Sequence, residues 1–146
     1  MKNLICVEMN SRGLRNNNPG NIRRSGGVLY RGETEGADKE FRTFTAQRWG
    51  FRAIFVLLHT YRLRYGICTI AEAIERWAPP TENNTAAYIA AVERLGSRGR
   101  SVPYDTLAEE DMVPIVAAIA RVENGTEADP SELQAGWRLF SEDYRR

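Results

Sequence analysis

Three carboxylates stand at positions where an acid could act on a substrate, and Glu123 is the strongest candidate. It follows the apolar run Ile115–Val122 and comes just before Gly125, a residue type that often ends a helix. Apolar neighbours and the partial negative charge of a helix C-terminus both favour a protonated carboxyl group. Such a group can donate its proton to a glycosidic oxygen, so we predict that Glu123 is a general acid. The simpler alternative is an exposed glutamate with no catalytic task.

Glu82 and Asp38 are the candidates for an auxiliary carboxylate. Glu82 lies in the segment Trp77–Thr85, and its alternative role is to stabilise the N-terminus of the next helix. Asp38 lies in a predicted hairpin, where it could equally be a turn residue. If one carboxylate acts, the sugar's own hydroxyl would displace the leaving group. If two carboxylates act, hydrolysis is expected.

Amide and aromatic side chains could supply the contacts to a sugar. The segment Arg15–Arg23 contains more side-chain amides than a turn requires. We predict that Asn17, Asn18 and Asn21 bind N-acetyl groups. Trp77 and Tyr88, together with Tyr30, could stack on sugar faces. Aromatic residues at helical spacing more often belong to the core, so both roles stay open for Trp77 and Tyr88.

The composition argues against several other chemistries. His59 is the single histidine and lies in an apolar helical run, so we predict a helix residue whose ring is hydrogen bonded. Mechanisms that depend on an imidazole base are therefore not expected. Cys6 and Cys68 make no disulfide framework, and we predict neither a metal nor a cofactor. A net charge of +1 argues against nucleic-acid binding, although arginines cluster locally.

Two helices are predicted in the first half of the chain. The first runs over about residues 46–65, and Gly66 ends it. The second opens with the capping-box pattern Thr69–Glu72 and ends before Trp77, because two prolines follow.

The second half of the chain is also predicted to be helical. A third helix begins at Asn83 or Asn84 and ends at Gly96. A second capping-box pattern, Thr106–Glu109, opens the next helical region. Pro114 should kink it or divide it into a short helix and a new start.

The remaining elements complete a mainly α fold. Asp129–Glu132 starts a last helix, and the Asn-rich segment Arg15–Arg23 should be a structured loop. Val28–Tyr30 and Glu40–Phe44 are strand-like and flank the turn at residues 32–38. We therefore predict one compact α+β domain over residues 1–146, with five helices, a small β-hairpin and a flexible lead over residues 1–12.

Several motifs of the sequence resemble those of a known protein family. The segment Gly13–Arg23, GLRNNNPGNIR, is similar to the opening motif of phage and prophage proteins described as virion structural proteins or endolysins. The resemblance continues in Phe41–Phe44, Trp49–Ala53, Tyr61–Thr69, Arg76–Thr85 with Tyr88, and Arg121–Gly125.

A looser resemblance connects the layout to lysozyme-superfamily glucosaminidases and lytic transglycosylases. In those enzymes a catalytic glutamate at a helix end is followed by an Asn-containing loop, a hairpin and further helices. In this chain no long helix precedes the loop. The helix Val113–Glu123 would have to reach the loop from the C-terminal side, as in a circular permutation.

The resemblance implies a lysozyme-like enzyme that cleaves the glycan strands of bacterial peptidoglycan as a muramidase, glucosaminidase or lytic transglycosylase. Virion or secretion-apparatus proteins are further candidate partners. The apolar stretch near the N-terminus is too short for a signal peptide, and no stretch approaches a membrane span. We therefore expect a protein made in the cytoplasm that acts at the cell wall or is carried in a virion.

Two rival functions predict different structures. A non-enzymatic virion structural or cell-wall-binding protein would have a Glu123 that points into solvent with no cleft nearby. A nucleic-acid-packaging protein would have one continuous basic face.

Overall fold

The computed structural model describes residues 11–145. Residues 1–10, which hold most of the expected flexible lead, lie outside the described residues, as does residue 146. The elements are α2 (Arg12–Arg15), β1 (Glu33–Thr34), β2 (Thr43–Phe44), α3 (Gln47–Tyr65), α4 (Ile70–Trp77), α5 (Thr85–Leu95), α6 (Glu109–Asn124) and α7 (Pro130–Asp143). The two strands pair antiparallel. The prediction of a mainly helical fold with a small β-hairpin is confirmed.

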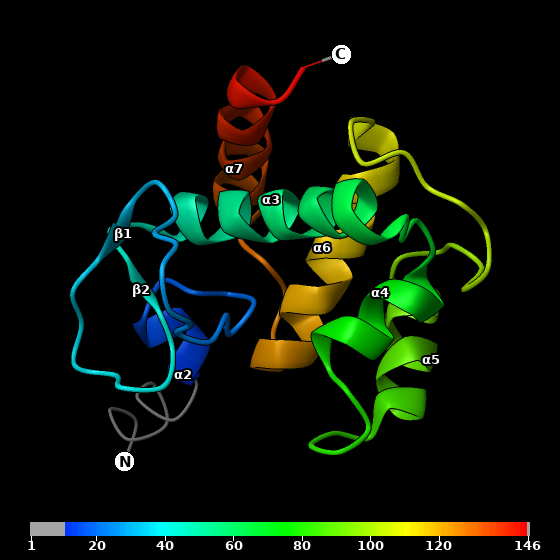
Figure 1. Ribbon diagram of the computed structural model, residues 1–146, viewed down its shortest axis with the longest axis horizontal. Coiled ribbons are helices and arrows are strands. Elements are labelled where there is room, and N and C mark those ends of the chain that lie inside the picture. Colours follow the sequence, from blue (N-terminus) through cyan, green and yellow to red (C-terminus); the bar gives the residue numbers. More distant parts are fainter. Residues whose placement is uncertain (1–10, 146) are drawn as a thin grey trace.

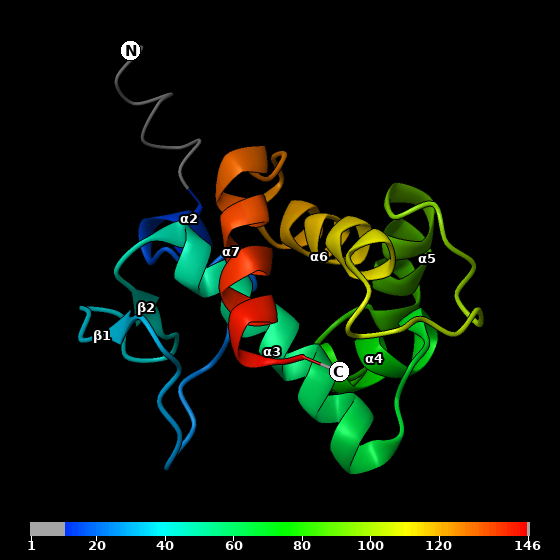
Figure 2. The same ribbon diagram turned by 90° about the horizontal axis from the view of Figure 1, so that it is seen from above.

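Helix α3 connects the two sides of the molecule. Figure 1 shows α2 and the β-hairpin near its first turns and α4 and α5 beyond its other end. Helix α7 packs across α3 (Figure 1), and α6 contacts α3, α5 and α7. The view from above shows α6 between α7 and α5 (Figure 2). None of the described helices combines the length and the apolar character needed to cross a bilayer.

The core forms where α3 packs against α7. The ring of Phe55 on α3 lies 5.1 Å from that of Trp137 and 5.9 Å from that of Phe140, both on α7. All three side chains are buried, so this contact removes a large aromatic surface from water. The other buried apolar residues of α3, α4 and α6 continue this core.

Most of the predicted helix ends are confirmed. Gly66 and Gly125 end α3 and α6 in the left-handed conformation, with φ of 69° and 71°. The Thr69 side chain caps α4, the Asn84 side chain caps α5, and Asp129 caps α7. Helix α4 includes Trp77 and thus ends one residue later than predicted.

The second predicted capping box is wrong. Helix α6 begins at Glu109 after Ala108, which offers no side-chain cap. Thr106 is buried, and its hydroxyl lies 2.8 Å from Nδ1 of His59. The predicted hydrogen-bonded ring of His59 is confirmed, and this contact with α3 is what takes Thr106 away from the helix end.

Two further local predictions need correction. Pro114 does not divide α6, which is continuous from Glu109 to Asn124, so this alternative is wrong and the predicted kink stays a prediction. The first strand of the hairpin is Glu33–Thr34 instead of residues 28–30, so it lies within the segment predicted as the turn. The predicted loop follows the short helix α2, which was not predicted and in which the Ser11 hydroxyl accepts a hydrogen bond from the Leu14 N–H.

Candidate active site

Glu123 lies in the last turn of α6 and is held by two neutral donors. The Tyr88 hydroxyl donates to its Oε2 at 2.8 Å, and Nδ2 of Asn21 donates to its Oε1 at 2.7 Å. Within residues 11–145, no Lys or Arg nitrogen lies within ion-pair distance of this carboxylate. The helix C-terminus adds partial negative charge beside it. Among the described residues, Glu123 is thus a half-buried carboxyl group without a cationic partner.

Tyr88 on α5 supports Glu123 from the protein interior. Its side chain is 8% exposed. Burial, and then the neighbouring carboxylate of Glu123, hold the pKa of the Tyr88 phenol well above its usual range. The phenol therefore stays protonated. A phenol can both donate and accept a hydrogen bond, so it can pair with either protonation state of a carboxyl group.

The Asn-rich loop carries Asn21 to the end of α6. Asn17 and Asn21 adopt φ of 53° and 48°, a left-handed conformation that asparagine tolerates better than most residues. The loop lies directly on α3, since a Cβ at Gly50 would come within 2.2 Å of the Asn17 carbonyl oxygen. This close approach needs glycine, and it fixes the height of the loop above the helix.

Asn17 and Asn18 shape the loop and do not line the cleft beside Glu123. Asn18 is fully buried, and its Nδ2 donates to the carbonyls of Ile22 and Arg42 while its Oδ1 accepts from the Ile22 N–H. Nδ2 of Asn17 donates to the Phe44 carbonyl. Of the three asparagines predicted to bind sugar, the structure brings Asn21 to the site.

Asn124, next to Glu123, fastens the same loop to α6. Its Nδ2 donates to the Pro19 carbonyl at 2.8 Å, and its Oδ1 accepts a hydrogen bond from the Ser11 hydroxyl at 2.6 Å. Glu123 and Asn21 are 102 positions apart in sequence. The loop and the end of α6 therefore meet although they lie far apart in the sequence. As expected, the helix that carries Glu123 reaches the loop from the C-terminal side of the chain.

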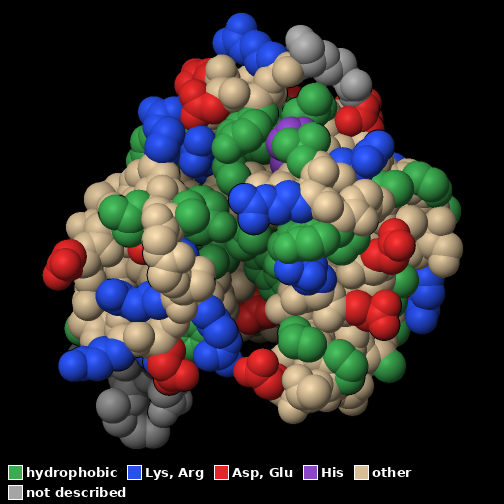
Figure 3. Space-filling model, viewed as in Figure 1, with side chains coloured by type: hydrophobic (Ala, Val, Ile, Leu, Met, Phe, Trp, Pro, Cys, Tyr) green, Lys and Arg blue, Asp and Glu red, His purple; other side chains and the backbone are tan. Residues whose placement is uncertain are grey.

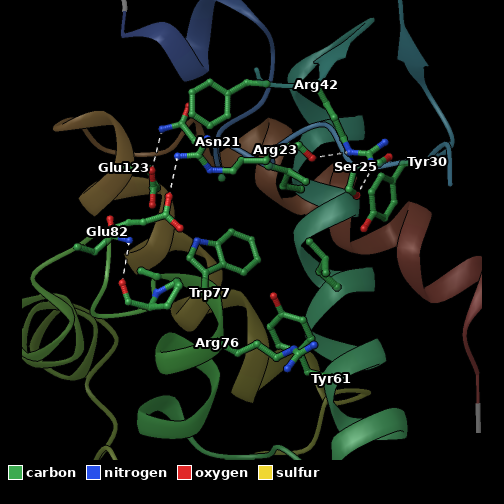
Figure 4. A pocket seen from close by; sticks show the side chains of 17 residues that line it. Asn21, Arg23, Ser25, Tyr30, Arg42, Tyr61, Arg76, Trp77, Glu82 and Glu123 are labelled. Carbon is green, nitrogen blue, oxygen red and sulfur yellow. Dashed lines mark hydrogen bonds and ion pairs between the residues drawn. The ribbon is translucent and has the colours of Figure 1, made fainter. Parts of the chain in front are cut away.

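A cleft of about 430 Å³ opens beside Glu123. Figure 3 shows it as a hollow on this face, with hydrophobic side chains inside and charged ones along its rim. Trp77 from α4 lies in its middle, and Glu82 and Arg23 lie near Glu123 (Figure 4). Nitrogen and oxygen of Arg23 and Glu82 are 3.4 Å apart, and both side chains are more than half exposed. The cleft thus has a partly apolar interior with carboxylates at one end.

Asp38 lies elsewhere. It lines a separate, shallow hollow and accepts hydrogen bonds from Arg12, from Asn16 and from the backbone N–H groups of Glu40 and Phe41. The Arg12 guanidinium, with these further donors, holds the pKa of the Asp38 carboxyl well below its usual range. Asp38 is thus a fixed anion outside the cleft of Glu123.

The structure adds cleft residues that the sequence did not single out. These are chiefly Tyr61, Arg76, Ser25 and Arg42. Tyr61 and Arg76 come from α3 and α4, where helical periodicity does not distinguish a core position from a cleft wall. The pair Arg76-Trp77 was visible within the motif that ends α4, and this was the one signal that could have included Arg76.

The comparison with known proteins decides the affiliation. The chain is 38% identical over 119 residues to Protein P5 of Pseudoalteromonas phage PM2, a match that covers 80% of this chain and 72% of that protein. The chain belongs to the family of this phage protein. The predicted phage affiliation is thereby confirmed. No protein-family model matches the chain.

Proposed function

We propose that this member of the phage protein family cleaves the glycan strands of bacterial peptidoglycan, with Glu123 as the general acid. The observation that carries the proposal is the carboxyl group of Glu123 at the wall of a cleft, where its hydrogen-bond donors among residues 11–145 are neutral groups. Cleavage of a glycosidic bond requires such an acid and neither a metal nor a histidine.

The surroundings of Glu123 can serve both states of an acid that gives up and regains a proton. When the carboxyl group is protonated, the Tyr88 hydroxyl can accept instead of donate. Oδ1 of Asn21 is buried and has no hydrogen-bond partner within residues 11–145. A rotation of this amide would present Oδ1 to a protonated Glu123, so both neighbours can follow the proton.

The cleft favours the mechanism with one carboxylate. Asp38 lies outside it, and Glu82 is exposed and faces Arg23. In the proposed reaction, Glu123 gives its proton to the glycosidic oxygen as the bond from that oxygen to the anomeric carbon breaks. A hydroxyl of the same sugar then bonds to the anomeric carbon, and its proton returns to Glu123. The products are an anhydro sugar and a free hydroxyl on the departing strand, as for a lytic transglycosylase. Trp77 offers a flat apolar surface for a sugar ring.

The family relationship supports a phage context for this activity. We infer that the protein acts at the cell wall during phage lysis or as part of a virion. The purely structural alternative expected a Glu123 pointing into solvent with no cleft nearby, and this differs from the observed contacts with Asn21 and Tyr88.

Nucleic-acid packaging is poorly supported by the arginine clusters. Arg12 is paired with Asp38, Arg98 with Asp111, and Arg100 with Glu93. Carboxylates of the protein therefore already occupy these cations, and phosphate contacts would have to displace them.

The test is digestion of purified peptidoglycan by wild type, Glu123→Gln and a matched control, Glu127→Gln. Glu127 is exposed and follows the same helix end outside the cleft. Wild type and Glu127→Gln should release fragments with anhydro ends that mass spectrometry detects, and Glu123→Gln should release none above background. Reducing ends would instead indicate hydrolysis with Glu82 as the auxiliary group. Equal release by all three proteins would remove Glu123 from the mechanism, and no release by any of them from several wall types would contradict the enzymatic function.

A further inference from the structure

A second hollow of about 580 Å³ continues the cleft along α3. The two hollows share six lining residues, so they form one groove: Ser25, Tyr30, Arg42, Leu57, Tyr61 and Arg76. Figure 4 shows Arg42 and Arg76 on the far side of Trp77 from Glu123. We call the part away from Glu123 the arginine end of the groove.

The two parts of the groove differ in the carboxylates that line them. Glu82 and Glu123 line the first hollow and are absent from the second. Among the described residues, no Asp or Glu lines the arginine end, whereas five arginines do: Arg31, Arg42, Arg52, Arg64 and Arg76. A ligand that fills the whole groove therefore meets two carboxylates and Arg23 at one end. At the other end it meets guanidinium groups and, among the described residues, no lining carboxylate.

The cations of the arginine end are only partly neutralised by the protein. Arg42 pairs with Glu33, while Arg31 and Arg52 share Asp143. Five arginines thus face two carboxylates, which leaves three positive charges in excess.

Arg64 and Arg76 have no carboxylate partner within residues 11–145. The Arg76 guanidinium instead lies 3.8 Å from the centre of the Tyr65 ring and donates to its hydroxyl. Stacking holds the guanidinium in place without cancelling its charge, so its remaining N–H groups can bind an anion.

Arg52 gives an independent sign of unmet hydrogen bonding. It is 4% exposed and lines the arginine end, and its buried Nε–H has no hydrogen-bond partner among the described residues. A buried cation that is only partly satisfied is costly, and a bound anion nearby would offset that cost.

We propose that the arginine end binds the carboxylates of the peptide stems that branch from the glycan, while the cleft holds the sugars. This inference rests on the proposed function and names the part of the substrate that fixes its orientation. A stem peptide carries carboxylates separated by short alkyl groups. The exposed apolar side chains of Val28, Leu29 and Tyr65 lie beside the arginines, as such a chain requires. The glycan and its peptide would then run in one direction along the groove.

The test is equilibrium binding in a Glu123→Gln background, so that no strand is cut during the measurement. The probes are free stem peptides released by an amidase, glycan strands with intact peptides, and strands from which the amidase has removed them. The variant is Arg64→Glu. The matched control is Arg62→Glu, because Arg62 is exposed on the same helix and does not line the groove.

Arg64→Glu should weaken binding of free peptides and of peptide-bearing strands by about fivefold or more, and this loss should shrink in high salt. Arg62→Glu should bind like the background protein, and stripped strands should bind all variants equally. Equal losses from Arg62→Glu and Arg64→Glu would overturn the inference, as would an equal loss for stripped strands or no peptide binding at all. Strand cleavage by wild type is read separately. Peptide binding that depends on Arg64 would therefore stand even if no cleavage occurred.

Discussion

Glu123 and Asp38 are both carboxylates that accept an amide hydrogen bond from the same Asn-rich loop, yet their surroundings differ. Asp38 faces Arg12 and two backbone N–H groups, while Glu123 faces the Tyr88 phenol and the end of a helix. The first environment fixes a negative charge. The second gives the carboxyl group partners that can exchange donor and acceptor roles. The two carboxylates therefore differ in the charge of their partners, and the different roles proposed for them follow from that difference.

Exchanging each carboxylate for its amide should separate activity from stability. On the proposed function, Glu123→Gln lowers strand cleavage by about 100-fold or more, the contribution typical of a general acid, with little change in melting temperature. Asp38→Asn should keep its cleavage rate and melt at a lower temperature, because Arg12 loses its charged partner. Fragment release and thermal unfolding followed by circular dichroism measure the two effects.

The pH dependence of unfolding provides a control for the Asp38 variant. The pKa of Asp38 lies below its ordinary value of 3.8, so its stabilisation is present above that pH and is lost as the pH falls further. The acid limb of the stability profile should be flatter in Asp38→Asn than in wild type. A variant that lost cleavage and kept its stability would reverse the roles of the two carboxylates.

The two asparagines that bind these carboxylates offer a matched pair of smaller changes. Nδ2 of Asn21 donates to Glu123, and Nδ2 of Asn16 donates to Asp38. Asn21→Gly keeps the positive φ accessible and removes one hydrogen bond to a charged group, so cleavage should fall about tenfold. Asn16→Gly should leave cleavage unchanged. Kinetics on peptidoglycan compare the two, and equal losses would mean that the amides act only through the shape of the loop.

The smallest expected effect is on alkaline stability. The pKa of the Tyr88 phenol is raised in the folded state by burial and then by Glu123, so its contribution to stability is present below the ordinary value of 10 and is lost as the pH rises above it. In denaturant unfolding at several alkaline pH values, the free energy of unfolding should fall less steeply with pH for Tyr88→Phe than for wild type. Glu123→Gln should reduce this slope only in part, because burial remains. Identical slopes in all three proteins would show that Tyr88 is exposed to water in solution.

The sequence predicts the helices and their ends well where local chemistry decides. Gly125 and Asp129 define the end of α6 and the start of α7, because a left-handed glycine and an aspartate cap act on their own neighbours. Thr106 shows the limit. Its pattern matches a cap, but a hydrogen bond to His59 on another helix takes its hydroxyl, and that contact depends on the tertiary fold.

The candidate site was predictable in part: Glu123, Asn21 and Trp77 were singled out from the sequence. The cleft residues Tyr61 and Arg42 were not. Glu123 stands out because the end of an apolar helix is visible in sequence. Asn18 and Asn21 are the same residue type in one loop, and spacing does not reveal that the amide of Asn18 serves only backbone groups. The arginine end escapes prediction because Arg31, Arg52 and Arg76 come from separate segments that meet only in the folded chain.

The hydrogen bonds that join residues 11–21 to residues 123–124 also affect when the site can form during synthesis and folding. During synthesis, the Asn-rich loop leaves the ribosome about a hundred residues before the carboxylate that it contacts. Contacts that span this much sequence form late in folding, because the entropy of closing so large a loop must first be overcome. A chain that lacks residues 123–124 therefore holds half a site, and the chemistry proposed for Glu123 would become available only after both segments have been made.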